Sequence, residues 1–144
     1  MEGVPSALDK SVVFDTPHIT GKQPTVEFAK SLWKVGWIGL IVIVIIGSLL
    51  PADSQVMRAV NRLPVSDKLQ HLVAYAALAF LPTLYERSAK LRMILGLTLV
   101  LGIVLEFGQI YSPGRTCDMY DMLADGVGVL TGFVVGLRVR LLNA

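Results

Sequence analysis

Charged residues and cysteines are both scarce in this sequence. Only 17% of the 144 residues are Asp, Glu, Lys or Arg, against ~25% in a typical soluble domain, whereas 53% are hydrophobic. This apolar content excludes a disordered chain, and the single cysteine excludes a disulfide scaffold or a zinc site with several cysteines. The net charge of +2 is too small for a nucleic-acid-binding protein. The composition therefore indicates one small membrane domain.

The beginning of the chain differs from the remainder. Residues 1–31 are polar, carry charges of both signs and scattered prolines, and show no sustained hydrophobic period. This pattern predicts a flexible cytoplasmic tail. No apolar run lies near Met1, so we expect no cleavable signal peptide. The membrane domain then covers residues 32–144.

Four apolar stretches in this domain are long enough to predict membrane-spanning helices. They cover about residues 32–50, 67–85, 91–112 and 118–137. Between the first two, residues 53–63 predict a short amphipathic helix on the membrane surface. We therefore expect an all-α fold, a four-transmembrane-helix bundle with a short interfacial helix between spans 1 and 2. The alternative of one span plus a soluble helical core is rejected, because residues 69–144 are too apolar to cover themselves in water.

Lysine and arginine are distributed unequally between the two sides of the predicted bundle. With the N-terminus inside, nine of them lie on the cytoplasmic side, and four, Arg58, Arg62, Lys68 and Arg115, lie on the outer side. Cytoplasmic flanks of membrane proteins are enriched in these residues. We therefore expect a multi-pass protein of the cytoplasmic (inner) membrane with both termini inside.

Polar side chains gather at the predicted outer ends of spans 2, 3 and 4. They are Asp67, His71, Glu106, Gln109, Arg115, Asp118, Asp121 and Asp125. A carboxylate facing lipid costs several kcal/mol unless it is paired or protonated, so we expect these groups to converge on one outward-facing pocket with Asp125 at its floor. We also expect Arg115 to neutralise one carboxylate and Asp67 to hold His71 as an i,i+4 pair.

A purely structural role explains some of these residues equally well. Asp67 and Asp118 could stabilise helix N-termini through the macrodipole, and Lys68 could extend to the lipid headgroups. Such explanations are weakest for Glu106 and Asp125, because both lie deep in apolar stretches.

The cluster has the residue types of an acid–base or metal site, but it completes no known catalytic motif such as His-Glu-x-x-His or Gly-x-Ser-x-Gly. The candidate catalytic residues are His71, Glu106 and Asp121. The candidate metal ligands are Asp118, Asp121 and Asp125, which would suit a divalent cation. No other cofactor is expected.

Span 4 also carries a small residue at every fourth position: Ala124, Gly128, Gly132 and Gly136. Such a stripe lets two helix backbones approach closely. Packing inside the bundle is the favoured use of the stripe, and a homodimer formed through it is the alternative.

The order of these motifs resembles that of a known family. The VanZ-like family of bacterial integral membrane proteins is similar in four motifs over roughly residues 35–140: Ser-Asp-Lys-Leu-Gln-His-Leu-Val-Ala-Tyr (66–75), Glu106-x-x-Gln109, Ser-Pro-Gly-Arg-Thr (112–116) and Asp118-x-x-Asp121-x-x-x-Asp125-Gly126. The family usually has Asn where this chain has Asp125. Its name comes from a protein associated with resistance to teicoplanin, a lipoglycopeptide antibiotic that acts on the outer face of the membrane.

This resemblance implies a cell-envelope role and an outward-facing polar site, with membrane lipids and an envelope precursor or glycopeptide antibiotic as partners. Two function classes follow. The first is a non-catalytic protein whose pocket binds a lipid headgroup, an envelope precursor or a lipoglycopeptide. The second is an intramembrane enzyme acting on a phosphorylated lipid headgroup, with Arg115 on the phosphate. A proton- or ion-coupled transporter is disfavoured, because the inner halves of all four spans are apolar.

Overall fold

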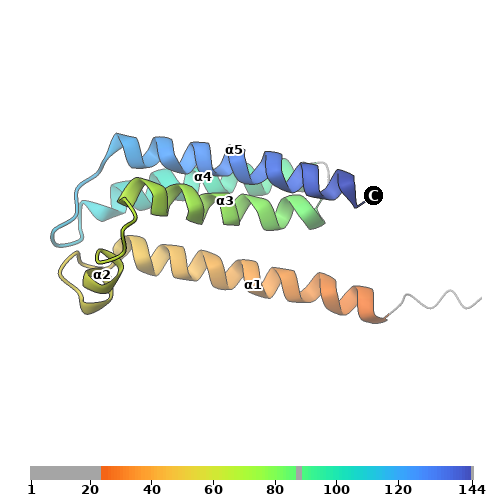
Figure 1. Ribbon diagram of the computed structural model, residues 1–144, viewed down its shortest axis with the longest axis horizontal. Coiled ribbons are helices and arrows are strands. Elements are labelled where there is room, and N and C mark those ends of the chain that lie inside the picture. The colour runs from red at the N-terminus through yellow and green to blue at the C-terminus, as the bar shows by residue number, and fades with distance from the viewer. Residues whose placement is uncertain (1–23, 87–88, 144) are drawn as a thin grey trace, which may run out of the picture.

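The structure, a computed structural model, describes the backbone of residues 24–86 and 89–143 and side chains from residue 32 onward. It contains five helices in this part of the chain: α1 (Pro24–Leu49), α2 (Gln55–Val60), α3 (Asp67–Tyr85), α4 (Ala89–Gln109) and α5 (Met119–Leu142). The described residues form no strand, which confirms the predicted all-α class. Figure 1 shows the four long helices side by side, with the short α2 at one end.

Serine and aspartate side chains set the starts of three helices. Ser54 accepts the N–H of Met57 at the start of α2, and Ser66 accepts the N–H of Leu69 at the start of α3. Asp118 caps α5 in the same way. These caps satisfy N–H groups that have no partner within the helix, so each helix begins at a residue that the sequence specifies.

Proline does not end α3. Pro82 lies inside the helix, which continues to Tyr85. A proline has no N–H, which frees the carbonyl four residues earlier. The indole N–H of Trp37 donates to that carbonyl, on Leu78, at 2.8 Å. The break in the helix hydrogen bonding thereby becomes a contact between α1 and α3.

Helix α1 begins inside the segment predicted as a flexible tail. Its start at Pro24 overlaps residues 24–31 of that tail. The rest of the predicted tail, residues 1–23, lies outside the described residues, as does Arg87 of the predicted cytoplasmic loop. The flexible tail therefore stays a prediction.

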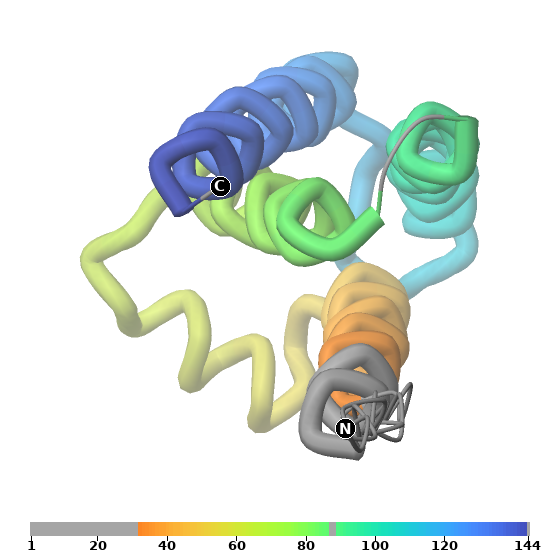
Figure 2. Tube along the Cα trace, turned by 90° about the vertical axis from the view of Figure 1, so that its right-hand side faces the viewer, coloured from red at the N-terminus to blue at the C-terminus, as the bar shows by residue number. Residues whose placement is uncertain are grey.

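Helix α3 occupies the middle of the bundle and contacts α1, α4 and α5 (Figure 2). The core is built around it from Tyr75, Leu78 and Ala79, with Val44 of α1 and Val129 of α5 packed against them. Large apolar side chains are instead exposed on the outer faces of α1, α4 and α5. This inside-out distribution is that of a protein surrounded by lipid rather than water.

Three helices are long and apolar enough to cross a membrane: α1 over Leu32–Leu49, α4 and α5. Helix α3 is not among them, although the sequence predicts a fourth span at its position. Its first five residues include Asp67, Lys68 and His71, which lowers its mean hydropathy. The structure also has a helix, α2, where a short interfacial helix is predicted, and its place at a membrane surface stays a prediction.

The two backbones of α3 and α5 meet along the small-residue stripe. A Cβ added to Gly128 would lie 2.5 Å from the carbonyl oxygen of Leu72, and one on Gly132 would collide with the backbone of Ala76. Gly136 meets the C-terminal part of α3. Any larger residue at these three positions would force the helices apart.

The stripe is therefore covered within one chain. Gly128, Gly132 and Gly136 are buried, and Ala124, its first member, is half-buried. The structure thus uses the stripe for packing α5 on α3, and a homodimer through it stays a prediction.

Candidate functional site

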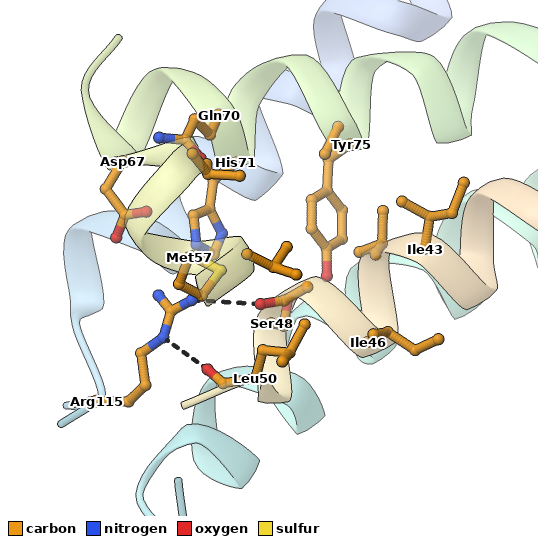
Figure 3. Close-up of a pocket in the computed structure, with 15 residues that line it drawn as sticks. Ile43, Ile46, Ser48, Leu50, Met57, Asp67, Gln70, His71, Tyr75 and Arg115 are labelled. Carbon is orange, nitrogen blue, oxygen red and sulfur yellow. Dashed lines mark hydrogen bonds between the residues drawn. The ribbon is translucent and has the colours of Figure 1, made fainter. Parts of the chain in front are cut away.

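A cavity of about 390 Å³ opens between α1, α2 and the first turns of α3 (Figure 3). Its polar lining consists of Asp67, Gln70, His71 and Tyr75 of α3, Ser48 of α1, and Arg115 of the loop between α4 and α5. Its apolar lining comes mainly from α1, α2 and the segment between them: Ile43, Val44, Ile46, Leu50, Val56, Met57 and Val60. In Figure 3 Asp67, His71 and Arg115 lie toward one end, and Ile43 and Ile46 toward the other. The cavity is therefore amphipathic.

His71 is held in the cavity wall by a residue of α5. Its Nδ1 lies 2.9 Å from Oδ1 of Asp125, and the two side chains are only 11% and 4% exposed. An ionised carboxylate can only accept a hydrogen bond, so with Asp125 ionised the proton of this contact is on Nδ1 and Nε2 is the second nitrogen. The expected pairing of His71 with Asp67 is corrected here: close packing of α5 on α3 brings the orienting carboxylate from another helix.

Gly102 of α4 makes room for this pair. A Cβ at this position would lie 2.8 Å from Oδ2 of Asp125 and 3.2 Å from Oη of Tyr75. Tyr75 is itself buried and lines the cavity. A single glycine in an apolar span has no sequence pattern to mark it, so the sequence offers no signal for Gly102.

Lys68 neutralises the carboxylates at the start of α5. Its Nζ lies 2.7 Å from Oδ2 of Asp118 and 3.1 Å from Oδ1 of Asp121. Asp118 also accepts the N–H of Tyr120 as the cap of α5. The hydrogen bonds from Lys68 and from the Tyr120 backbone hold the pKa of the Asp118 carboxyl below its usual value. The bridge therefore ties the first turn of α3 to the first turn of α5.

Arg115 does not pair with a carboxylate among the described residues, which corrects the expected pairing. Its Nε and Nη2 donate to the carbonyl oxygens of Leu50 and Gly47, 3.4 and 3.3 Å away. The carbonyls at the end of a helix lack partners in the helix itself, so they attract the guanidinium to the end of α1. Its side chain still lines the cavity.

Glu106 and Gln109 lie on the buried face of α4, with exposed fractions of 1% and 2%. One carboxylate oxygen of Glu106 accepts the N–H of Asp118 and so fixes the turn that enters α5. The other oxygen, and Nε2 of Gln109, have no hydrogen-bond partner within the described residues. Neither residue lines the cavity.

The eight predicted pocket residues thus form two groups. Asp67, His71 and Arg115 line the cavity. The other five do not line it: Glu106, Gln109, Asp118, Asp121 and Asp125. The two groups are joined by the His71–Asp125 contact. Of the three candidate catalytic residues, His71 alone is in the cavity wall.

The residues able to hold a metal ion differ from the predicted set. Asp67, His71 and Asp121 each present one ligand atom, and these atoms lie within 4.8 Å of one another. Of the predicted ligands, Asp118 and Asp121 are both bound by Lys68, and Asp125 is in contact with His71. Lys68 therefore neutralises carboxylates for which the sequence predicts Arg115 or a bound cation as the partner.

The fold and this site define an all-helical membrane protein with a charged cluster at one end of its bundle. The chain belongs to the VanZ/LLP1 family, because the model of that family matches residues 18–140. This match confirms the resemblance carried by the sequence motifs. No curated protein and no solved structure matches the chain.

Proposed function

We propose that this protein acts in the cell envelope by binding an amphiphilic molecule in the cavity between α1, α2 and α3. The observation that carries the proposal is the division of one cavity into a polar and an apolar end. Its volume of about 390 Å³ falls in the range of small-molecule sites. The headgroup would lie at Asp67, His71 and Arg115, with the apolar part against Ile43 and Ile46.

The proposal includes a four-span arrangement in which α3 crosses the membrane with α1, α4 and α5. Helix α3 has 19 residues and is about 28 Å long, close to the ~30 Å thickness of the hydrocarbon core. It packs along α5, which is apolar enough to span. A membrane crossed by α5 therefore surrounds α3 as well, and the exposed polar first turn of α3 would lie at the membrane surface.

The cavity would face outward in the cytoplasmic membrane. Four spans place both termini on one side, and the excess of lysine and arginine on the flanks assigns that side to the cytoplasm. Helix α2 and the loop between α4 and α5 then lie at the outer surface, where α2 rests on the headgroup region. Three ligand classes suit an outer amphipathic cavity: a lipid headgroup, an envelope precursor and a lipoglycopeptide of the teicoplanin type.

Filling the cavity tests this function. Ala74 lines it, whereas Ala77, one turn further along α3, does not. The full chain would be purified in mild detergent from cells, and co-purified amphiphiles would be counted by native mass spectrometry. We expect a retained amphiphile with the unaltered chain and with Ala77→Phe, and loss of it with Ala74→Phe. Equal retention by Ala74→Phe, with an unchanged unfolding temperature, would contradict the proposal.

The His71–Asp125 contact favours one second candidate, an enzyme acting on a phosphorylated lipid headgroup. A carboxylate that orients a histidine in a cavity is the arrangement of a general base. His71 would take the proton of a water that attacks the phosphorus, and the P–O bond to the diacylglycerol would break. His71 would then return the proton to the leaving alkoxide, with Arg115 holding the phosphate oxygens.

Turnover separates the two candidates. Phospholipid vesicles containing the protein would be followed for release of a water-soluble phosphorylated headgroup. The enzyme predicts steady release that falls ~100-fold or more in His71→Gln, whereas the binding function predicts none. Release that persists in His71→Gln at the original rate would exclude His71 as the base.

A further inference from the structure

We infer that the amphiphile bound in this cavity is a phospholipid with a zwitterionic headgroup, one that carries a phosphate and a primary ammonium. This inference rests on the proposed function and names its ligand class. The observation behind it is that the polar end of the cavity presents one acidic and one basic side chain, Asp67 and Arg115.

The acidic group is available to a ligand. Asp67 lies in the first turn of α3 and is exposed. It forms no ion pair within residues 24–86 and 89–143, because the neighbouring Lys68 binds Asp118 and Asp121 instead. A carboxylate accepts hydrogen bonds only, and it therefore suits the N–H groups of an ammonium.

The guanidinium of Arg115 is held in place by hydrogen bonds that involve only some of its N–H groups. Arg115 donates through Nε and Nη2 to two carbonyl oxygens at the end of α1. A guanidinium has five N–H groups, and Nη1 has no acceptor in the described part of the chain. The carbonyl contacts orient the side chain, and the remaining N–H groups suit a phosphate.

Charge complementarity favours a zwitterion over the alternatives. A headgroup with negative charge only would meet the carboxylate of Asp67. A headgroup with positive charge only would meet Arg115. A phosphate with an ammonium a few bonds away satisfies both side chains.

The size of the cavity indicates a lipid whose chains leave it. At ~30 Å³ for one water molecule, a cavity of about 390 Å³ has the volume of about a dozen water molecules. This is room for a headgroup and the beginning of the acyl chains. The apolar walls are supplied by α1 and α2. Ile43 and Ile46, which belong to this wall, are largely exposed beyond it, so the chains can continue from the cavity along α1 into the membrane.

Lipid competition tests the inference. The full chain would be exchanged into detergent with equal amounts of phosphatidylethanolamine, phosphatidylcholine and phosphatidylglycerol, and the bound lipid would be identified by native mass spectrometry. We expect phosphatidylethanolamine to be retained about fivefold over phosphatidylglycerol, the ratio that one partly exposed charge contact supports. Phosphatidylcholine, whose ammonium has no N–H, should lie between them.

Two substitutions give opposite results if the two charges act as inferred. Asp67→Asn should remove or reverse the preference for phosphatidylethanolamine, whereas Arg115→Gln should lower the retention of all three phospholipids. Asp53→Asn and Arg58→Gln, exposed and outside the cavity lining, are the matched controls and should leave both readouts unchanged. A preference that survives Asp67→Asn would overturn the inference.

The remaining outcomes separate this inference from the proposed function. If the unaltered chain retains all three lipids without preference, the inference of a zwitterionic headgroup is wrong, while the proposed function of binding an amphiphile still holds. No retained lipid or other amphiphile overturns both. Free phosphoethanolamine, added as a competitor, should displace little lipid. If it displaces as much bound lipid as the intact lipid does, the ligand is a soluble phosphoethanolamine compound and the inference of a membrane lipid is wrong.

Discussion

The two ends of the helix bundle use the same chemistry for different purposes. At the C-terminal end of α3, Arg140 donates to the carbonyl oxygens of Thr83 and Glu86, both at 2.9 Å. At the opposite end, Arg115 donates to two carbonyls at the end of α1, at 3.3 and 3.4 Å. Both arginines cap a helix C-terminus, which is a structural role.

The surroundings of the two arginines differ. Arg140 does not line the cavity between α1, α2 and α3, and at its end of the bundle Trp33 of α1 stacks on Tyr85 of α3. Arg115 lines a cavity that also holds an oriented histidine and Asp67, a carboxylate that forms no ion pair with the described residues. The proposed binding site therefore lies at the Arg115 end, where a cavity and further hydrogen-bonding groups accompany the arginine.

The largest effect should come from the seam that holds both ends together. Gly132→Leu would place a side chain into the backbone of α3 at Ala76, and we expect a loss of at least ~3 kcal/mol of stability, the upper end for overpacking. Thermal unfolding in detergent measures it. Gly126→Leu, on the same helix but with open space around it, is the control. Equal unfolding temperatures would show that α5 does not pack on α3 along the stripe.

A smaller effect should be confined to the polar end. Gly102→Ala puts a methyl group 2.8 Å from Oδ2 of Asp125, so the carboxylate that contacts His71 must shift and the geometry of the pair is disturbed. We expect a loss of about 1–3 kcal/mol, as for other overpacked sites, together with weaker amphiphile retention. Gly96→Ala, on the same helix with nothing near its Cβ, should instead be neutral or stabilising by ~1 kcal/mol. Full amphiphile retention by Gly102→Ala would separate the His71–Asp125 pair from the site.

Gly132 and Gly102 differ in how well the sequence predicts their roles. Gly132 belongs to a stripe with a fixed period, and that period, visible in the sequence itself, predicts a packed seam. Gly102 is a single small residue in an apolar helix, and its role depends on which side chains of α3 and α5 face it. The helices, the polar end and the packed seam were therefore predictable, whereas the pairing of individual side chains between helices was not.

The ion pairs illustrate the same limit. Arg115 and Lys68 are both candidate partners for the same carboxylates, and the choice between them depends on the rotation of α3 against α5. The close glycine seam turns Lys68 toward Asp118 and Asp121, while the free carbonyls of α1 attract Arg115. The apolar wall of the cavity likewise depends on how α2 folds back beside α1, which no local pattern specifies.

The two arginines give a direct test of the comparison. Arg140→Met removes two contacts of 2.9 Å at a partly buried helix end, and we expect a loss of about 1–2 kcal/mol. Arg115→Met removes longer, weaker contacts, so the unfolding temperature should fall less while amphiphile retention falls more. The comparison would be broken if Arg140→Met reduced retention or if Arg115→Met were the more destabilising change.

The smallest effect should come from the exposed bridge between α3 and α5. Because the pKa of the Asp118 carboxyl is lowered in the folded protein, the ionised bridge contributes stability at pH values above the ordinary aspartate value of 3.8. This contribution is lost as the pH falls through the lower folded value. Thermal unfolding measured from neutral pH down to about pH 3, a range that spans the ordinary aspartate value, should show a decline that is shallower in Asp118→Asn than in the control Asp53→Asn. Salt should reduce the difference at neutral pH, since exposed charges are screened. An acid decline that is unchanged in Asp118→Asn would mean that Lys68 stabilises the α5 end through Asp121 alone.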